Sequence, residues 1–265
     1  MNELLYEKQG AIARIIINRP EKRNALNSAV IHGIDESLKM AAEDDEGRVV
    51  ILTGAGEKAF TAGFDLKEAM EHNITGVVER RKDTSEEIEF FMRMWHFPKP
   101  IVAAIRGYCI GGITLAMLSD MVIATEDATF GNPEILLGYV PEFPMEVWKM
   151  PFNKVREFFY LSKFFTAAEM RDMNVVNQVV PGEKLEETVM AVAERIAQIP
   201  PESTKIIKYS LNKCYELQGF RNTIDFVSEL FNLGRVHMQT TQVDDFRSDI
   251  AEGGLASALK KQYNK

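Results

Sequence analysis

Two short runs of alternating apolar and polar residues lie near the beginning of the chain. Residues 3–20 read ELLYEKQGAIARIIINRP, with Gln9 and Gly10 between the two runs. Alternation with a period of two is typical of β-strands, and a glycine between two such runs is typical of a tight turn. The pattern therefore predicts a β-hairpin that ends at Arg19-Pro20.

The following segment, residues 27–46, has a helical period instead. Its apolar positions recur on one face, at Val30, Ile34, Leu38 and Ala41. Ser28 is the predicted N-cap, because a serine hydroxyl accepts well from the free amides of a first helical turn. Residues 48–54, RVVILTG, are a continuous β-branched run, which is typical of a strand buried on both faces.

The alternation of strand and helix continues to about residue 127. Residues 83–97 have helical spacing, 99–107 form a second buried strand, 111–120 open a helix on two glycines, and 121–127 form a third strand. Strands that alternate with helices predict a parallel sheet with crossover connections. After Pro151 the helical period dominates, in residues 153–162, 166–173, 184–199, 202–217 and 221–236. We therefore expect an α/β core with a C-terminal helical layer.

The last of these helices, residues 221–238, carries more apolar residues than one buried face requires. They are Ile224, Phe226, Val227, Leu230, Phe231 and Leu233. Either the helix lies in the core of its own chain, or its excess apolar surface meets another subunit. The sequence leaves both interpretations open.

Composition and charge narrow the class of protein. The chain has 265 residues, of which 46% are hydrophobic and 26% charged, as expected for one large globular domain or a core with an appendage. Its net charge of -8 argues against binding to nucleic acid. Neither a signal peptide nor a membrane-length apolar run is evident, so we expect a cytoplasmic protein without a membrane partner. The two cysteines and four histidines lack ligand spacing, and no metal site is predicted.

Two glycine-bearing turns follow predicted strands. The first is FTAGFDLKE, residues 60–68, and the second is RGYCIGGITLAM, residues 106–117. Glycine lets the backbone approach a ligand, and the first amides of a helix have no partner within it. Two such turns facing each other could direct two N–H groups at one oxygen, which is an oxyanion hole for a thioester enolate. Alternatively, Gly111-Gly112 serves only a tight turn and close packing.

Two glutamates stand in the otherwise apolar run FGNPEILLGYVPEFP, residues 130–144. They are Glu134 and Glu142. A carboxylate in apolar surroundings must be paired, solvated or neutralised, and burial would raise its pKa toward that of a useful base. Glu142 has a second interpretation as a solvated loop residue, because Pro141 and Pro144 are typical of irregular surface structure.

Five segments in this order resemble the crotonase family, the enoyl-CoA hydratases and isomerases. They are NRPEKRNALN (18–27), GEKAFTAGFDLKE (56–68), PKPIVAAIRGYCIGG (98–112), SDMVIATEDATFGNPEILLG (119–138) and AAEMRDMNVVNQVVP (167–181). The resemblance implies a core of repeated ββα units over residues 1–200, which holds an acyl-CoA site. It also implies a C-terminal helical trimerisation region over residues 201–265, acting as interface or lid, in a homotrimer or a hexamer built as a dimer of trimers.

The resemblance also implies which residues form the site. Two backbone amides, those of Phe64 and Gly111, would polarise the thioester carbonyl, and Glu134 would be the catalytic base. Coenzyme A is part of the substrate, so no separate cofactor is implied. Residues along its path and at the second turn are Arg23, Ala25, Ala62, Asp65, Leu66, Gly112 and Thr114, with Lys260 and Lys261 as candidates for its phosphates.

The chain departs from the family pattern at the second turn. Hydratases typically read Gly-Gly-Gly-x-Glu-Leu there, whereas this chain reads GGITL, so Thr114 stands where the first catalytic glutamate would be. The loop 107–111 is also one residue short, which could displace Gly111 by one position. A hydratase uses two carboxylates, but a double-bond isomerase needs one base. With Glu134 as that base, the resemblance favours isomerisation.

Three alternatives remain. Glu142 could supply the second acid and restore enoyl-CoA hydration. The same oxyanion hole could serve hydrolysis or C–C cleavage of a β-keto acyl-CoA, or the protein could bind CoA without catalysis. Trp148 and Phe143 either line the acyl pocket or belong to the core.

Overall fold

A six-stranded sheet forms the centre of the molecule. The computed structural model describes residues 2–65, 67–68, 76–237 and 241–263. Strand order in the sheet is β1-β2-β3-β5-β7-β10, with β1 antiparallel to β2 and the other pairs parallel. The strands are β1 (Leu4–Gln9), β2 (Ile12–Ile17), β3 (Val49–Gly54), β5 (Ile101–Ile105), β7 (Met121–Thr125) and β10 (Gln178–Val180). The predicted hairpin and the predicted parallel pairing are both confirmed.

A second sheet consists of strands of two or three residues. They are β4 (Ala59–Thr61), β6 (Tyr108–Ile110), β8 (Thr129–Gly131) and β9 (Phe165–Thr166). The first three are parallel, and each follows a strand of the large sheet, β3, β5 or β7, within a few residues. The chain therefore repeats a unit of long strand and short strand followed by a helical segment, and the expected ββα architecture is confirmed.

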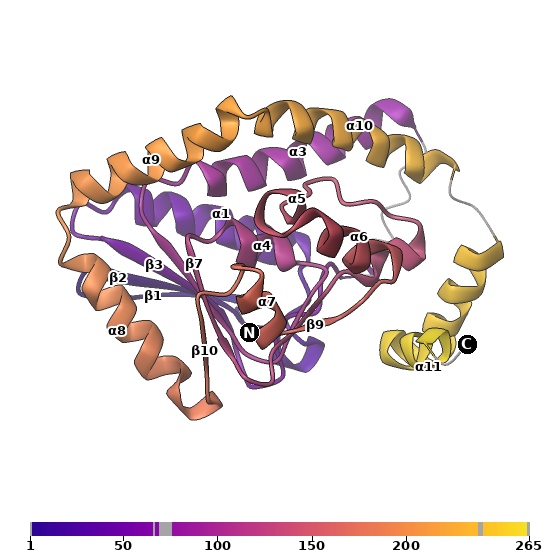
Figure 1. Cartoon of the computed structure of the whole chain (residues 1–265), viewed down its shortest axis with the longest axis horizontal. Helices are drawn as coiled ribbons and strands as arrows, with labels where there is room; N and C mark the ends of the chain where they lie inside the picture. Colours follow the sequence, from indigo (N-terminus) through magenta and orange to yellow (C-terminus); the bar gives the residue numbers. More distant parts are fainter. Residues whose placement is uncertain (1, 66, 69–75, 238–240, 264–265) are drawn as a thin grey trace.

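Helices cover both faces of the large sheet. On one face lie α1 (Ser28–Glu43), α3 (Val77–Trp95) and α4 (Ile113–Leu118), over the main hydrophobic core (Figure 1). On the other face α8 (Leu185–Ala197) packs against β3, β5 and β7 around a smaller core. Burial on both faces explains the continuous apolar runs of the central strands.

The remaining helical segments connect or flank these layers. They are η1 (Pro20–Lys22), η2 (Pro133–Leu137), α5 (Glu146–Lys149), α6 (Phe152–Tyr160), α7 (Ala167–Asp172), η3 (Gly182–Lys184), α9 (Pro201–Leu217), α10 (Phe220–His237) and α11 (Thr241–Tyr263). The last is interrupted at Gly254, where φ is +75°. It packs on η2 through a small cluster of Leu137, Phe246 and Ala258.

The N-cap of α1 differs from the prediction by one residue. Asn27 is the cap, because its side-chain oxygen accepts from the amide of Val30 at 3.0 Å. Ser28 is instead the first helical residue, and its amide donates to the carboxylate of Glu68 at 3.2 Å, while its hydroxyl contacts the same group. Asn and Ser are equally good caps, so the sequence alone did not distinguish two adjacent candidates.

A buried lysine fastens α9 to the large sheet. Lys208 is 7% exposed, and its Nζ donates to the carbonyl of Lys99 at 2.9 Å and to Asp120 at 2.7 Å. The carboxylate of Asp120 also accepts from the amide of Ile101, the first residue of β5. A division of the chain near residue 200 stays a prediction.

Helix α10 has one buried apolar face and one exposed one. Ile224 and Phe231 are buried, whereas Phe226, Leu230 and Leu233 are 64%, 43% and 56% exposed. The prediction that the helix contributes to the core is thus confirmed, and the subunit interface stays a prediction. Further exposed apolar side chains on α9 are Ile206, Ile207, Tyr209, Leu211 and Leu217. Within the described ranges, no helix combines the length and apolarity needed to cross a membrane.

Candidate active site

The two glycine turns meet at van der Waals distance. Gly63 and Gly111 both have a positive φ, +92° and +63°. A Cβ atom added at Gly111 would lie 2.7 Å from the Cα of Gly63 and 2.8 Å from Oε1 of Glu134. The backbones therefore leave no room for a side chain, and the carboxyl group of Glu134 lies beside their contact.

Hydrogen bonds on either side of Phe64 fix the first turn. The amide of Leu26 donates to the carbonyl of Gly63, and the amide of Asp65 donates to the carbonyl of Leu26, both at 2.8 Å. In such a bridge the intervening amide points away from the partner strand. Among the described residues, the N–H of Phe64 has no hydrogen-bond acceptor, and Phe64 lines a cavity of about 490 Å³.

The second turn uses its amides within the fold. The N–H of Gly111 donates to the carbonyl of Gly131 at 3.0 Å, and that of Gly112 donates to Ile110 at 2.7 Å. The first of these bonds continues the pairing of β6 with β8, in which Ile110 lies opposite Gly131. The role of Gly111 as a donor stays a prediction, since it requires exchange of this bond for a bond to substrate.

Glu134 is held on a tight helical turn. The side chain of Asn132 accepts from the amide of Glu134 at 3.2 Å, and Pro133 supplies a fixed φ at the first position. The turn closes at Gly138, where φ is +79°. Burial raises the pKa of Glu134 to about 8, and the charges of Glu142 and Glu146 act in the same direction. This is the environment of a carboxyl group that can exchange a proton near neutral pH.

Glu142 is buried, and the interpretation as a solvated loop residue is wrong. It is 8% exposed and lines the same cavity as Glu134. The neighbouring Phe143 is fully buried and packs against Phe91 with the two rings tilted, their centroids 5.2 Å apart. This aromatic contact buries the loop between Pro141 and Pro144. The two prolines alone did not indicate that burial. Trp148 likewise packs on aromatic rings of the core.

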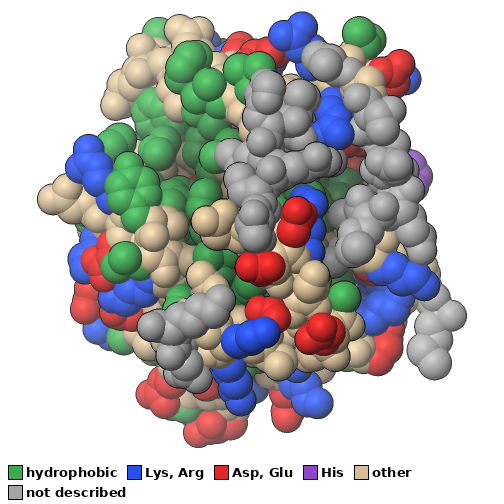
Figure 2. Space-filling model, turned by 90° about the vertical axis from the view of Figure 1, so that its right-hand side faces the viewer, with side chains coloured by type: hydrophobic (Ala, Val, Ile, Leu, Met, Phe, Trp, Pro, Cys, Tyr) green, Lys and Arg blue, Asp and Glu red, His purple; other side chains and the backbone are tan. Residues whose placement is uncertain are grey.

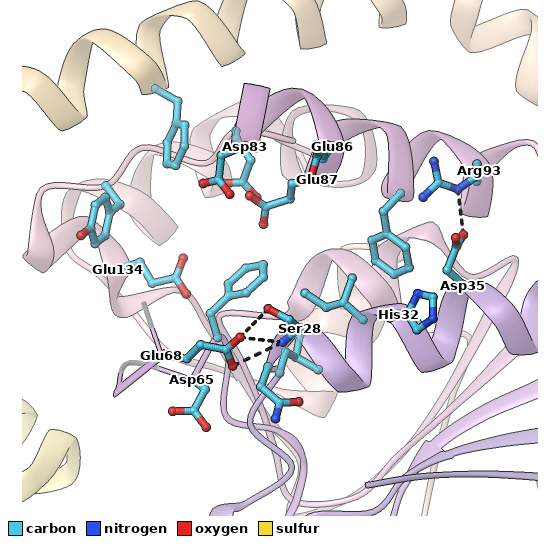
Figure 3. Close-up of a pocket in the computed structure, with 18 of the residues that line it drawn as sticks. Ser28, His32, Asp35, Asp65, Glu68, Asp83, Glu86, Glu87, Arg93 and Glu134 are labelled. Carbon is cyan, nitrogen blue, oxygen red and sulfur yellow. Dashed lines mark hydrogen bonds and ion pairs between the residues drawn. The ribbon is translucent and has the colours of Figure 1, made fainter. Parts of the chain in front are cut away.

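A cavity of about 490 Å³ contains both glutamates. Leu26, Ile31, Phe64 and Phe90 give it apolar walls. Acidic side chains gather near the middle of the face shown in Figure 2, and the close-up in Figure 3 shows carboxylates directed into one space. Those on α3 are Asp83, Glu86 and Glu87. Sequence reasoning missed these three, because acidic residues spaced for one helix face usually indicate a solvated face.

The two turns expected along the path of CoA are tied together by a buried arginine. Arg19 is 2% exposed, and its guanidinium donates to Asp65 at 2.9 Å and to the carbonyl of Ala25 at 2.7 Å. It also forms an ion pair with Glu3 at 3.0 Å. Burial acts to raise the pKa of Asp65, but the hydrogen bonds from Arg19 and from the backbone of Glu68, together with the positive charges of Arg19 and Lys22, outweigh it and lower that pKa. Asp65 therefore directs its charge toward the protein, and Arg19 is a residue that the motif search missed.

Other predicted contact residues are spread over several elements. Arg23 is exposed, with φ of +52°, and its guanidinium lies 6.0 Å from the ring centroid of Tyr108. Ala25 and Ala62 are half-buried on the two turns, while Leu66 lies outside the described residues.

Gly112 and Thr114 are buried at the beginning of α4, and the cavity lining found in the described part of the chain does not include them. Lys260 and Lys261 are exposed on the last turn of α11, where Lys261 forms an ion pair with Asp249. The contacts of all four with CoA stay predictions.

A third buried glutamate was also missed. Glu146 begins α5 and is 1% exposed. Burial raises its pKa to about 7, a hydrogen bond with its own backbone opposes this rise, and the charge of Glu142 adds to it. Within the described ranges, no group of three His, Cys, Asp or Glu side chains has the arrangement of a metal site.

Comparison with known proteins places this geometry in context. A family model described as enoyl-CoA hydratase/isomerase matches residues 7–251. The chain is 34% identical to a short-chain-enoyl-CoA hydratase of Clostridium acetobutylicum, over 87% of this chain and 88% of that protein. It is 33% identical to a probable mitochondrial enoyl-CoA hydratase of Dictyostelium discoideum, over 80% and 76% of the two chains. A crystal structure of an enoyl-CoA hydratase/isomerase from Xanthobacter autotrophicus superposes with a TM-score of 0.90 at 33% identity, covering 97% and 96%.

Proposed function

This chain belongs to the enoyl-CoA hydratase/isomerase family, and from that premise we propose that it adds water to the double bond of a 2-enoyl-CoA thioester. Glu134 and Glu142 are the proposed acid–base pair. The observation that carries the proposal is the burial of Glu142 in the cavity that Glu134 lines, where its charge raises the pKa of Glu134. A second carboxyl group in the cavity compensates for the threonine at position 114.

The proposed reaction needs one ionised and one protonated carboxyl group. The ionised one takes a proton from water as the water oxygen bonds to the β carbon of the substrate. The protonated one then gives its proton to the α carbon, so that atoms and charge balance. The amide of Phe64 donates to the thioester oxygen as negative charge develops there, with Gly111 as the proposed second donor. Arg23, Ala25 and Ala62 are proposed to line the path of CoA.

The test is a rate measurement on a 2-enoyl-CoA, with the product identified by its gain in mass of one water. We expect Glu134→Gln and Glu142→Gln each to lower kcat by about 10²- to 10⁴-fold, the usual contribution of a general acid or base. Glu126→Gln is the matched control, since Glu126 is exposed and outside the cavity lining. Retention of hydration within a few-fold in Glu142→Gln would contradict the proposed pair.

Double-bond isomerisation is the second candidate, favoured by Thr114 at the position of the usual first glutamate. One base removes the proton α to the thioester and returns it to the γ carbon. Supplied with a 3-enoyl-CoA, an isomerase would lose activity in Glu134→Gln and keep it in Glu142→Gln. The same assay with β-keto acyl-CoA esters detects hydrolysis or C–C cleavage, and binding without any turnover would identify a CoA-binding protein.

We also propose that the protein assembles as a homotrimer or as a dimer of trimers. The exposed apolar side chains of α9 and α10 support this, because monomers rarely expose several large ones on neighbouring helices. Light scattering gives the mass in solution. We expect the double variant Phe226→Glu with Leu233→Glu to have a lower mass than the unaltered protein. If the unaltered protein itself had the mass of a monomer, assembly would be contradicted.

A further inference from the structure

The cavity that Glu134 lines continues as a groove between helices α1 and α3. Side chains from one face of each helix line it, at the spacing of three or four residues that places them on the same side. Figure 3 shows the two rows, with Glu134 near one end and the contact between Asp35 and Arg93 at the other. The groove is lined by Ser28, Ile31, His32 and Asp35 on α1, and by Asp83, Glu86, Glu87, Phe90 and Arg93 on α3.

This interhelical groove has an apolar floor and a polar rim. Phe90 is 3% exposed and Ile31 is half-buried, so both present carbon surface at depth. His32 and Glu86 are exposed, one on each helix. A saturated carbon chain lying on the floor would bury its surface, while the rim side chains keep their contact with water. The groove therefore fits a linear aliphatic group.

An ion pair joins the two helices at the far end of the groove. Nε of Arg93 donates to Oδ1 of Asp35 at 2.7 Å, and Nζ of Lys39 lies 3.0 Å from Oδ2 of the same carboxylate. Burial acts to raise the pKa of Asp35, but the hydrogen bonds and charges of Arg93 and Lys39 outweigh it and lower that pKa. The pair is therefore ionised. A methylene group pressed against it would displace water from charged groups and gain no apolar contact.

The geometry of α1 gives the length of chain that the groove accepts. Ser28 and Asp35 are seven positions apart in the sequence, which is about 10 Å along a helix. An extended carbon chain advances roughly 1.3 Å per atom, since its bonds of about 1.5 Å follow a zigzag. About eight carbon atoms therefore reach from the reaction centre to the ion pair.

We propose that the Asp35–Arg93 ion pair determines acyl-chain specificity, and that the preferred acyl group is a linear aliphatic chain of about eight carbon atoms. The inference rests on the proposed function in one respect, namely that the cavity holds the acyl group of a CoA thioester. It adds the chemical class of that group. Asp35 and Arg93 act on the binding of the chain and take no part in the chemical step.

The direct test is calorimetry with saturated CoA esters of four, eight and twelve carbons, which have no double bond to hydrate. Each buried methylene tightens binding by up to about fourfold, and we expect at least about tenfold from four to eight carbons. From eight to twelve carbons we expect less than about twofold, because the added methylenes meet the ion pair. A continued rise to twelve carbons, or no gain beyond four, would overturn the proposal.

Arg93→Ala opens the far end of the groove. We expect this variant to bind the twelve-carbon ester about tenfold more tightly than the unaltered protein does, with unchanged affinity for the four-carbon ester. Arg93→Lys keeps a cation beside Asp35 and should keep the original length dependence. The matched control is Arg81→Ala, since Arg81 is exposed on the same helix, pairs with Glu229 and is absent from the described cavity lining. The same length dependence in Arg93→Ala as in the unaltered protein would overturn the role of the pair.

Ile31→Phe tests the groove without altering the ion pair, and it serves if Arg93→Ala does not fold. The larger side chain fills the floor before the chain reaches Asp35, so the gain in affinity should end at fewer than eight carbons. An unchanged gain up to eight carbons would show that the chain does not lie between the two helices.

The kinetic readout is kcat/KM for 2-enoyl-CoA esters of the same three lengths. We expect Arg93→Ala to lower KM for the twelve-carbon ester by about tenfold and to leave kcat within twofold, since the pair does not touch the reacting atoms. Binding that varies with length in the absence of any turnover would contradict the proposed function alone. Turnover with no dependence on chain length would contradict only the inference drawn from the groove.

Discussion

Gly111 is the residue at which the backbone of the site has least room. Its φ of +63° already disfavours any residue with a Cβ atom, at a cost of about 1 to 2 kcal/mol. A methyl group there would also meet the Cα of Gly63 at 2.7 Å, a backbone atom that cannot turn aside. We expect Gly111→Ala to lower the free energy of unfolding by clearly more than the conformational cost, and to abolish activity.

Gly10 offers a matched control for this substitution. Its φ is +57°, almost the same, but an added Cβ would meet no atom within 4 Å. Gly10→Ala should therefore lower the free energy of unfolding only by the conformational cost, about 1 to 2 kcal/mol, and the variant should keep its activity. Urea unfolding of the two variants gives both free energies of unfolding. Equal decreases for Gly111→Ala and Gly10→Ala would show that contact with Gly63 is unimportant.

Glu146 also gives stability a defined dependence on pH. Its pKa in the folded protein, about 7, lies above the ordinary value of 4.5, so the folded state binds more protons between these values. Stability then falls as pH rises through this window, by on the order of 2 to 3 kcal/mol. Relative to Glu146→Gln, we expect the unaltered protein to lose that amount between pH 5 and pH 8 in chemical unfolding. A constant difference between the two proteins across this range would contradict the raised pKa.

The sequence identified some site residues more readily than others. Glu134 was found because it follows Asn132-Pro133 within a motif, and the local turn depends on those same neighbours. The burial of Glu142 and Glu146 was not predictable, because it comes from aromatic contacts such as Phe143 with Phe91, which are 52 positions apart in the printed sequence. The spacing of residues in the sequence predicts local turns. Burial depends instead on which distant segments pack over a loop.

At the scale of elements, a salt bridge connects the two turns on the proposed path of CoA. Asp65→Asn removes one partner of the buried guanidinium of Arg19, which keeps its ion pair with Glu3. Breaking a buried pair typically costs about 3 to 5 kcal/mol, and the remaining partner should reduce this to about 2 to 3 kcal/mol. We expect a lower thermal midpoint and a higher KM for the CoA thioester, with a smaller change in kcat.

Asp127 provides the control for that variant, since it is exposed. Asp127→Asn should leave both the thermal midpoint and KM unchanged. If Asp65→Asn also left the thermal midpoint and KM unchanged, the bond between the two turns would contribute nothing to stability or binding.

The packing of α11 on η2 supports the element that carries Glu134. Phe246 is 4% exposed in the cluster with Leu137. Phe246→Ala opens a cavity there, and removal of a buried Phe typically costs about 3 to 5 kcal/mol. We expect faster hydrogen exchange at the amides of Gly138 and Tyr139, which are both hydrogen-bonded within the turn, and unchanged exchange in the large sheet. Arg247→Ala, at the exposed neighbouring position, is the control. Equal exchange in both variants would argue that η2 is stable without α11.

The long elements were predictable and the short ones were not. Strands β3, β5 and β7 have five or six residues each, enough for a continuous apolar run to indicate burial. Strands β4, β6, β8 and β9 have two or three, too few for any period to emerge, and their pairing depends on the turns that precede them. The resemblance to a family supplied this second sheet, where periodicity could not.

At the scale of the whole molecule, the site depends on contacts between segments that are distant in the chain. Gly63, Gly111 and Glu134 come from successive ββα units, and the sheet brings them together. Each unit contributes one part, and none forms a cavity alone. This explains why the order and spacing of motifs indicated the site better than any single motif did.

The buried Lys208 has a consequence for the order in which a ribosome delivers the chain. Its partner Asp120 leaves the ribosome 88 residues earlier, which at 5 to 20 residues per second is about 4 to 18 s. During that interval the carboxylate of Asp120, which accepts from the first amide of β5, lacks its cation and must remain hydrated. We therefore expect this end of the nascent sheet to stay hydrated until α9 has been synthesised, and a translational pause before codon 208 to prolong that stage of its biogenesis.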